Sequence, residues 1–410
     1  MLHTRSMHAW RSALAFDGSR FRSEGATVLV DDGVILGVEP AAYDVPADCP
    51  VTEFSGTLLP GLVDAHVHLV SDGGPGSLER VAMQSAEEID RAIEASLRAQ
   101  AAHGVTTVRD LGDRDYLTLA WRDRAEPGLP RIVAAGPPIT TPGGHCHYLG
   151  STAASPDELV AAVCEHDERG VNVIKVMASG GFLTPGTDML GAQYQAAQLR
   201  AVVEAAHALG LQVLAHAHSV TGIEAALDAG VDGIEHFTGI CEDGAVLSDD
   251  LLDRVAAAGV LVDPTMGNDF SLIATLPPPP PQIEELMARL GLDRQAFFME
   301  RYAHVGRMRD RGVRVVPGVD AGAMPLKAHG NAWLAVTDLV TAGWPVAEAL
   351  AAGTSGAADA CGLGGVTGSL RPGLAADLLV VDGDVRSEPA ALGRPIAVAV
   401  RGESVLTPQP

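Results

Sequence analysis

The stretch Leu59-Pro60-Gly61-Leu62-Val63-Asp64-Ala65-His66-Val67-His68-Leu69 predicts a buried strand with two histidines at alternate positions. A Pro-Gly turn leads into this strand, and its residues are too apolar for a strand exposed to solvent. Because side chains alternate across a strand, His66 and His68 project to the same side. Neutral imidazole nitrogens are good ligands for zinc and its neighbours, so the stretch indicates a metal site. The alternative is a pair of polar residues on a half-exposed strand.

Short strand-like runs separated by Asp-Gly turns occupy residues 7–58 and recur after residue 376. This pattern is typical of a small antiparallel sheet. Each end of the chain is too short to form a stable unit alone. We therefore expect residues 1–59 and 366–410 to pair into one composite β-sandwich domain.

Between the two ends, residues 60–365, strand and helix patterns alternate. The strand-like runs are Val63–His68, Thr106–Leu111, Arg131–Ala135, Val173–Ala178, Gln212–His216, Gly233–His236, Val260–Asp263 and Val313–Gly318. The helical patterns are Glu87–Ala102, Pro156–Arg169, Gln195–Leu209, Thr221–Asp228, Asp249–Ala258 and Glu284–Arg311. Glycines stand where several helices should end: Gly104, Gly170, Gly210, Gly230, Gly259 and Gly312. The repeated unit predicts an α/β fold of the (β/α)8 TIM-barrel type. An open doubly wound sheet is the alternative, but no Gly-x-Gly-x-x-Gly follows a strand.

Composition limits the classes of partner. The 410 residues carry 28 Lys and Arg against 52 Asp and Glu, a net charge of −24, which argues against nucleic acid and anionic membranes. No run of about 18 apolar residues indicates a membrane span. The first eleven residues lack the apolar core of a signal peptide. Five scattered cysteines without a Cys-x-x-Cys pair suit a reducing cytoplasm, where we place the protein. We also expect a homo-oligomer.

In a barrel of this type, the chemistry lies at the carboxyl ends of the strands. Polar residues gather at these predicted ends: His66, His68, Lys175, His216, His218, His236 and Asp320. Singly, each has an ordinary explanation. A buried lysine must be paired or neutral, and a salt bridge is its commoner state. A neutral amine can instead react with carbon dioxide to give a carbamate, which offers two oxygens to bridge two metals. The histidines alone could be core residues, and Asp320 a turn or cap residue. Together, the set predicts a metal site.

These residues resemble the ligand set of the amidohydrolase superfamily. The chain is similar, over about residues 10–405, to its imidazolonepropionase-like and prolidase-like branch, which includes Xaa-Pro dipeptidases and ochratoxinase-like amidases. Four phrases carry the resemblance beyond the first stretch: Thr106-Thr107-Val108-Arg109-Asp110, Lys175-Val176-Met177-Ala178-Ser179-Gly180-Gly181, His216-Ala217-His218 and Gly233-Ile234-Glu235-His236.

The resemblance implies a site with two divalent metal ions, expected to be zinc. His66, His68, Asp320 and carboxylated Lys175 would hold the more buried ion, and Lys175, His216 and His236 the second. A hydroxide between the ions would be the nucleophile, and Asp320 would take its proton and pass it to the leaving amine. One position departs from the family pattern, because Val319 stands where a Thr is usual and offers no hydroxyl to orient its neighbours.

Substrate contacts are expected from the loops that follow the strands. The Gly-rich segment 142–148 carries His145 and Tyr148, and relatives place a histidine of this loop near the substrate. His218 should face the same side as His216 and bind a substrate carboxylate or carbonyl; its alternative is a supporting hydrogen bond. Arg301 and Tyr302 are further candidates for an anionic end of the substrate.

The sequence therefore predicts a metal-dependent hydrolase that cleaves an amide or peptide-like C–N bond in a small molecule. Hydrolysis or deamination of a cyclic amide or heteroaromatic substrate on the same metal core is the first alternative. A non-catalytic scaffold is the second, and it is disfavoured because every expected ligand and Asp320 are present.

Overall fold

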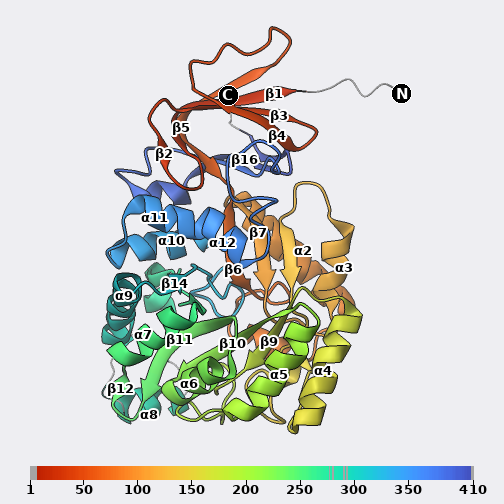
Figure 1. Ribbon diagram of the computed structural model, residues 1–410, viewed down its shortest axis with the longest axis vertical. Coiled ribbons are helices and arrows are strands. Elements are labelled where there is room, and N and C mark those ends of the chain that lie inside the picture. The colour runs from red at the N-terminus through yellow and green to blue at the C-terminus, as the bar shows by residue number, and fades with distance from the viewer. Residues whose placement is uncertain (1–6, 277, 279–280, 290, 292–293, 408–410) are drawn as a thin grey trace.

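The computed structural model describes residues 7–276, 278, 281–289, 291 and 294–407 (Figure 1). Strands from both ends of the chain gather at one end of the molecule, and the strands and helices of the central segment form the body beneath them. The central part positions the predicted site.

Both ends of the chain contribute to one mixed sheet. Its order is β17-β16-β15-β5-β1-β3-β4, with β2 paired to β1. The strands are β1 (His8–Phe16), β2 (Phe21–Arg22), β3 (Ala26–Asp31), β4 (Val34–Glu39), β5 (Val51–Pro60), β15 (Leu378–Val381), β16 (Pro395–Val400) and β17 (Glu403–Leu406). β15 runs antiparallel to β5, with Leu379 opposite Leu59, so the two ends do pair. Within the described chain the pairing gives one sheet, and a two-layered sandwich is not shown.

One pairing differs from the antiparallel arrangement predicted for residues 7–58. β1 and β5 lie side by side in parallel, because β3 and β4 intervene in the chain and return it to the same direction. The Asp-Gly turn between β3 and β4 is as predicted. Asp32 and Gly33 both have positive φ, 48° and 74°, as a two-residue type I′ hairpin turn requires. Apolar side chains such as Trp10, Val28 and Val380 form a small core on this sheet.

The central strands form two parallel sheets. One has the order β6-β7-β8 and the other β9-β10-β11-β13-β14, with β12 (Gly244–Ala245) paired to β11. The bounds are β6 (Leu62–Val67), β7 (Val105–Asp110), β8 (Arg131–Ala134), β9 (Val173–Met177), β10 (Gln212–Ser219), β11 (Gly233–Cys241), β13 (Leu261–Asp263) and β14 (Arg314–Val315). A strand thus stands at each of the eight predicted places.

Isolated parallel bridges connect the two sheets at both edges. Val67 pairs with Ala321 beyond β14, and Ile139 beyond β8 pairs with Val176 of β9. β14 has two residues where Val313–Gly318 was predicted. Pro317 has no N–H to donate, and the N–H of Gly318 bonds Asp263 Oδ1 at 3.0 Å instead of a strand. The ladder of hydrogen bonds is therefore interrupted beside the site.

Helices follow most of these strands. They are α1 (Ser77–Val81), α2 (Ala86–Ala102), α3 (Leu117–Arg124), α4 (Pro156–Arg169), α5 (Ala196–Ala208), α6 (Val220–Ala229), α7 (Asp249–Ala258), α8 (Pro281–Arg289), α9 (Arg294–Asp310), α10 (Ala332–Thr341), α11 (Val346–Ala351) and α12 (Ala357–Ala360). Capping boxes begin α2 and α4. The six glycines expected at helix ends all have positive φ. None of the helices in the described part of the chain combines the length and hydropathy needed to cross a membrane.

The prediction of one helix over Glu284–Arg311 is wrong. The structure has two helices there, α8 and α9, and Gly291 lies between them with a φ of 65°. A residue in the left-handed region ends a right-handed helix, which an apolar repeat alone does not reveal.

Gly56 of β5 offers a test of the joint between the two ends of the chain. A Cβ at this position would overlap the carbonyl oxygen of Val381 in β15. We expect Gly56→Ala to lower the free energy of unfolding by about 1–3 kcal/mol through overpacking. Gly37→Ala is the control, because its Cβ would lie 3.5 Å from Leu29 Cδ1, an ordinary contact. Hydrogen exchange should rise in β15 for Gly56→Ala alone; equal exchange in both variants would contradict this role.

Candidate metal centre

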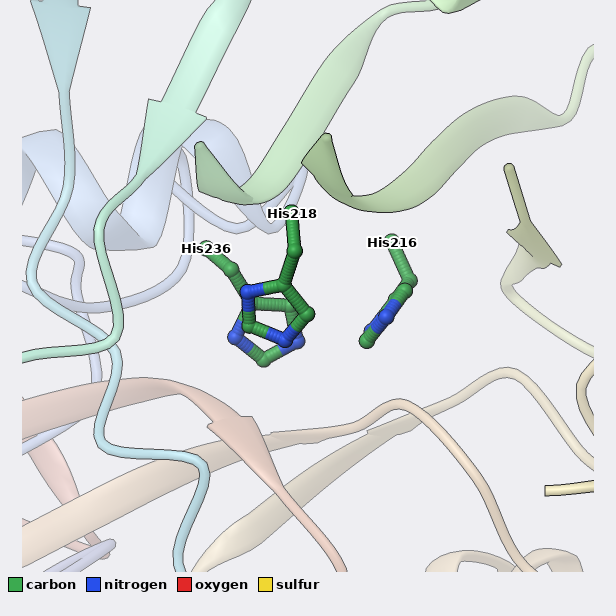
Figure 2. A group of neighbouring side chains, drawn as sticks. All are labelled: His216, His218 and His236. Atoms are coloured by element: carbon green, nitrogen blue, oxygen red, sulfur yellow. The ribbon is translucent and has the colours of Figure 1, made fainter. Parts of the chain in front are cut away.

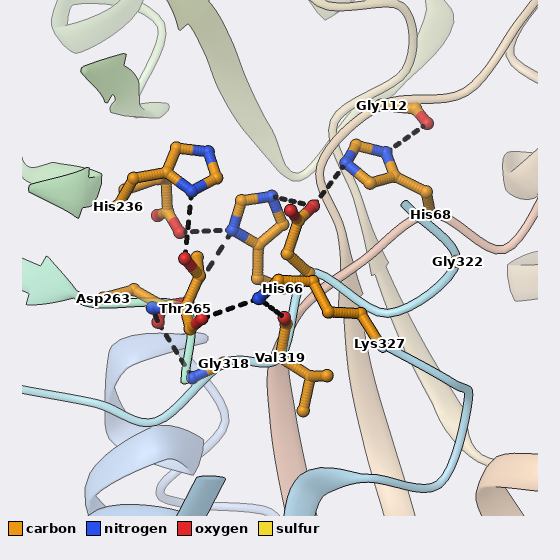
Figure 3. Close-up of polar contacts among 12 residues, drawn as sticks. His66, His68, Gly112, His236, Asp263, Thr265, Gly318, Val319, Gly322 and Lys327 are labelled. Carbon is orange, nitrogen blue, oxygen red and sulfur yellow. Dashed lines mark hydrogen bonds and ion pairs between the residues drawn. The ribbon is translucent and has the colours of Figure 1, made fainter. Parts of the chain in front are cut away.

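His66, His68 and Asp320 form a first buried cluster (Figure 3). His66 lies in β6 one residue before its end, His68 directly follows the strand, and Asp320 comes from the segment after β14. Asp320 Oδ1 lies 3.5 Å from His66 Nε2 and 3.1 Å from His68 Nε2. The Nδ1–H of His68 donates to the carbonyl of Gly112 at 2.9 Å, which leaves Nε2 directed at the carboxylate. The predicted alternation along the strand thus brings both imidazoles to one carboxylate.

Asp320 is held ionised in this cluster. Burial on its own would raise its pKa, but the charges of His66 and His68 and the hydrogen bond from His68 hold the pKa well below the usual range. The main chain supports the position, since the N–H of Asp320 donates to the carbonyl of His66 at 2.8 Å. The residue has a φ of 65°, a left-handed conformation that is costly for a residue other than glycine. An ionised carboxylate beside two imidazoles is a suitable donor set for a divalent cation.

His216, His218 and His236 form a second cluster, built on β10 and β11 (Figure 2). One nitrogen from each ring lies within 4.8 Å of the others. The rings of His218 and His236 stack with centroids 4.4 Å apart. Burial first, and then the neighbouring histidines, lower the pKa of His216 and His236 well below the usual value. The imidazoles are therefore neutral at pH 7, which is the form that binds metals.

The predicted bridging residue, Lys175 of β9, is 1% exposed. Its Nζ has no hydrogen-bond partner, and no carboxylate in the described ranges lies within ion-pair distance of it. Burial lowers its pKa, although Glu235 and Asp320 act in the opposite direction. The charge of Lys175 acts to lower the pKa of His66 in the first cluster and of His216 in the second. The salt bridge weighed as the commoner state of this lysine is not found.

Glu235, for which no role was predicted, contacts His66 on the side away from Asp320. Glu235 Oε2 lies 2.8 Å from His66 Nδ1, and Asp263 Oδ2 lies 3.7 Å from the same nitrogen. The guanidinium of Arg109 lies 3.5 Å from Glu235 Oε1. Burial and the adjacent Glu235 raise the pKa of Asp263 well above its usual range, so its carboxyl group keeps a proton. A carboxylate at this position orients a ligating histidine and increases its basicity.

Lys327 is a second residue without a predicted role, and it ties two loops of the site together (Figure 3). Its Nζ donates to the carbonyls of Thr265 at 2.7 Å and Val319 at 2.6 Å. The N–H of Val319 donates to Asp64 Oδ1 at 3.0 Å. The main-chain N–H and carbonyl group of Val319 are therefore both hydrogen-bonded. Although Val319 lacks the usual threonine hydroxyl, these bonds hold the segment before Asp320 in place.

The residues predicted to contact substrate divide into two groups. His218 belongs to the second cluster and His145 lies beside it: the ring of His145 is 4.4 Å from that of His216, between centroids. The guanidinium of Arg301 is committed to internal acceptors, Thr238 Oγ1 at 3.1 Å and the carbonyls of His236 and Pro264.

The two tyrosines have contacts outside the histidine clusters. Tyr302 donates to Asp338 Oδ1 at 2.8 Å, and Tyr148 contacts the Sγ of Cys146 at 3.6 Å. Nothing in these contacts tests a role in binding substrate, so His145, His218, Tyr148, Arg301 and Tyr302 stay predictions.

The donor chemistry fits two divalent ions. Neutral imidazoles, an ionised carboxylate and a buried amine without a partner are brought together from β6, β9, β10, β11 and the segment after β14. Burying this many unpaired polar groups is costly unless they bind something.

Comparison with known proteins agrees with this geometry. The model of the amidohydrolase family matches residues 57–405. An uncharacterized protein of Mycobacterium tuberculosis is 30% identical over 355 residues, 85% of either chain. Imidazolonepropionase of Ectopseudomonas mendocina is 32% identical over 251 residues, 53% of this chain and 60% of the relative. The crystal structure of a "putative prolidase" from Bifidobacterium longum is 29% identical, covers 99% of this chain and 96% of its own, and has a TM-score of 0.76.

The family match covers most of the chain, and the resemblance seen in the sequence is confirmed. The chain belongs to the amidohydrolase family, whose members are hydrolases that act on carbon–nitrogen bonds.

Proposed function

We propose that this protein is a metal-dependent amidohydrolase that cleaves an amide or peptide-like bond in a dipeptide or an N-acyl amino acid. The observation that carries the proposal is the buried amine of Lys175, without a partner between two histidine clusters. We also propose that residues 60–365 form a (β/α)8 barrel and that residues 1–59 and 366–410 form the second domain. The isolated bridges at both edges of the parallel sheets support the barrel.

The proposed ligands divide between the clusters. His66, His68 and Asp320 would hold one ion, His216 and His236 the other, and the carbamate of Lys175 would serve both. Zinc suits these imidazole and carboxylate donors. Divalent ions in such a site lower the pKa of water and polarise a carbonyl group.

The chain's own residues would then complete the reaction. Asp320 is ionised and buried, so it can accept the proton of the attacking water and deliver it to the leaving nitrogen. Glu235 and Arg109 fix the ring of His66 from the opposite side. His218 belongs to the second cluster and His145 lies beside it, and both would contact the carbonyl or carboxylate of the substrate.

Two substrate classes compete. The likeness to the Bifidobacterium longum protein favours a dipeptide-like substrate, and the likeness to imidazolonepropionase favours a cyclic amide. A panel of dipeptides, N-acyl amino acids and cyclic amides, assayed with zinc or manganese and bicarbonate, separates them by kcat/KM. Turnover of cyclic amides alone would replace the first proposal by the second. Fully loaded protein that hydrolyses none of them would favour the scaffold. Sedimentation of the same sample tests the expected homo-oligomer.

Lys175 allows a direct test of the carbamate, because the chain has two lysines, Lys175 and Lys327. Protein reconstituted with ¹³C-bicarbonate and zinc should show one carbamate carbon resonance and bind about two ions, as in two-metal sites. Lys175→Ala should lose the resonance, the second ion and most activity. Lys327→Arg, which keeps a cation, should retain the resonance. A resonance that survives in Lys175→Ala, or wild-type protein saturated by one ion, would show that the binuclear assignment is wrong.

Asp320→Asn separates the base from the ligand. The amide keeps the shape and one donor oxygen but accepts no proton, so kcat should fall by about 10²–10⁴-fold while bound metal persists. Because activity needs the ionised form and the pKa of Asp320 lies below its usual range, wild-type kcat should stay level as the pH falls to about 5. Metal content and kcat are measured on one sample. A loss below about tenfold at full metal content would assign the proton transfer to another residue.

Glu235→Gln tests the support of His66. The variant keeps the size of the side chain but removes the negative charge 2.8 Å from His66 Nδ1. We expect metal affinity to fall by about 10–100-fold, the usual effect of losing such a partner. Glu242→Gln, an exposed position, is the control for net charge. Competition with a chelating dye measures both, and unchanged affinity in Glu235→Gln would remove the role.

A further inference from the structure

A second feature lies at the amino end of β8, whereas the metal-binding residues lie at the carboxyl ends of their strands. A cavity of about 50 Å³ opens there between α2, α3, the first residues of β8 and the turn that joins β16 to β17. Leu97, Trp121 and Ile132 form apolar walls, and Arg131 and Arg401 provide cationic groups. The two arginines come from segments 270 residues apart, so the cavity joins the C-terminal strands to the central body.

Arg131 has a buried polar atom that is not satisfied within the protein. Its Nε is buried and has no hydrogen-bond partner. Among the residues that the structure describes, no carboxylate lies within ion-pair distance of Arg131, although Asp377 lies near enough for the arginine to lower its pKa against the effect of burial. A guanidinium with a desolvated, unpaired N–H costs free energy, which an oxyanion in the cavity would offset.

Arg401 faces the same cavity in a fixed position. Its N–H donates to Asp377 Oδ1 at 2.7 Å, and its guanidinium donates to the carbonyls of Glu126 and, at 3.3 Å, Leu129. Burial and then the charge of Arg131 lower the pKa of Arg401, so the two guanidinium groups repel each other. Glu126 also lines the cavity, and its carboxylate forms no ion pair with either arginine in the described structure.

The size of the cavity limits the ligand. A water needs roughly 10–15 Å³ of such volume, so the space accommodates about four waters or one small anion. Guanidinium groups bind carboxylate and phosphate through paired N–H donors. With a net charge of −24, the protein repels anions at long range, and local contacts must supply the affinity. We propose that this cavity is a binding site for a small oxyanion, held between Arg131 and Arg401.

A bound oxyanion would link two parts of the fold. It would accept hydrogen bonds from the first residue of β8 and from the turn after β16, and it would screen the repulsion between the two arginines. The site is separate from the metal centre and does not depend on the proposed function.

Calorimetric titration of the metal-loaded protein with inorganic phosphate and, separately, with acetate tests the site at constant ionic strength. Arg131→Gln should weaken binding by about tenfold or more, the effect of losing a charge-assisted hydrogen bond. Arg401→Gln should weaken the same binding event. Arg98→Gln is the control: it removes the same charge at an exposed arginine of α2 whose one ion pair within the described residues is with Glu94. Whichever anion loses affinity in the two variants identifies the ligand as a phosphate or a carboxylate.

Crystals of wild-type protein soaked in each anion locate the binding event and keep the test decisive if Arg131→Gln fails to fold. Density between the two guanidinium groups supports the site. Affinity that is unchanged in both variants, or an anion found only at the metal centre, would overturn it.

Discussion

The structure around the site is governed by the free-energy cost of burying several ionisable groups close together. Around one region of the molecule, Lys175, six histidines and four carboxyl groups are below 10% exposed: His66, His68, His145, His216, His218, His236, Asp64, Glu235, Asp263 and Asp320. In such surroundings a charge must be paired, neutralised or bound to a cation. The chain uses each of these solutions: neutral imidazoles at His216 and His236, a proton kept on Asp263, and contacts from His66 and His68 to Asp320. Lys175 has no hydrogen-bond partner in the described structure, and burial lowers its pKa toward the neutral amine, so this amine is the strongest indication of chemistry.

The parallel strands bring these groups together, and residues with strained backbone conformations, on the strands or just after them, orient the side chains. His236, Thr265 and Asp320 have φ values of 69°, 46° and 65°. Each such residue costs on the order of 1–3 kcal/mol and persists where its surroundings fix it. Lys327 supplies part of this restraint, because its ammonium holds the carbonyls of Thr265 and Val319. The backbone strain therefore lies at residues whose orientation sets the geometry of the site.

The sequence predicted what periodicity determines. Alternation along a strand placed His66 with His68, and the common direction of parallel strands placed these residues near Asp320. Contacts between side chains from distant segments leave no periodic pattern in the sequence, so no role was predicted for Glu235 and Lys327. Pro317 and the side chain of Asp263 interrupt the last strand, which its apolar run could not show. The pairing of the two ends was predictable because neither end can bury its apolar face alone. The parallel register of β1 and β5 was not predictable, because it depends on the path of the intervening strands.

The distribution of lysine and arginine in the chain supports the role proposed for Lys175. In the described part of the chain, each ion pair that involves a cation other than histidine uses arginine, and both lysines are buried at the site, 1% and 7% exposed. Arginine keeps its charge at any ordinary pH, so it suits ion pairs. Lysine can lose its proton when buried, which is the condition for forming a carbamate. Burial lowers the pKa of both amines, and Asp320 opposes this effect at both. Lys327 differs from Lys175 because its Nζ donates to two carbonyl groups, which favour the ammonium form. We therefore expect the same residue type to serve as a fixed cation at Lys327 and as a reactive amine at Lys175, because the contacts around the two nitrogens differ.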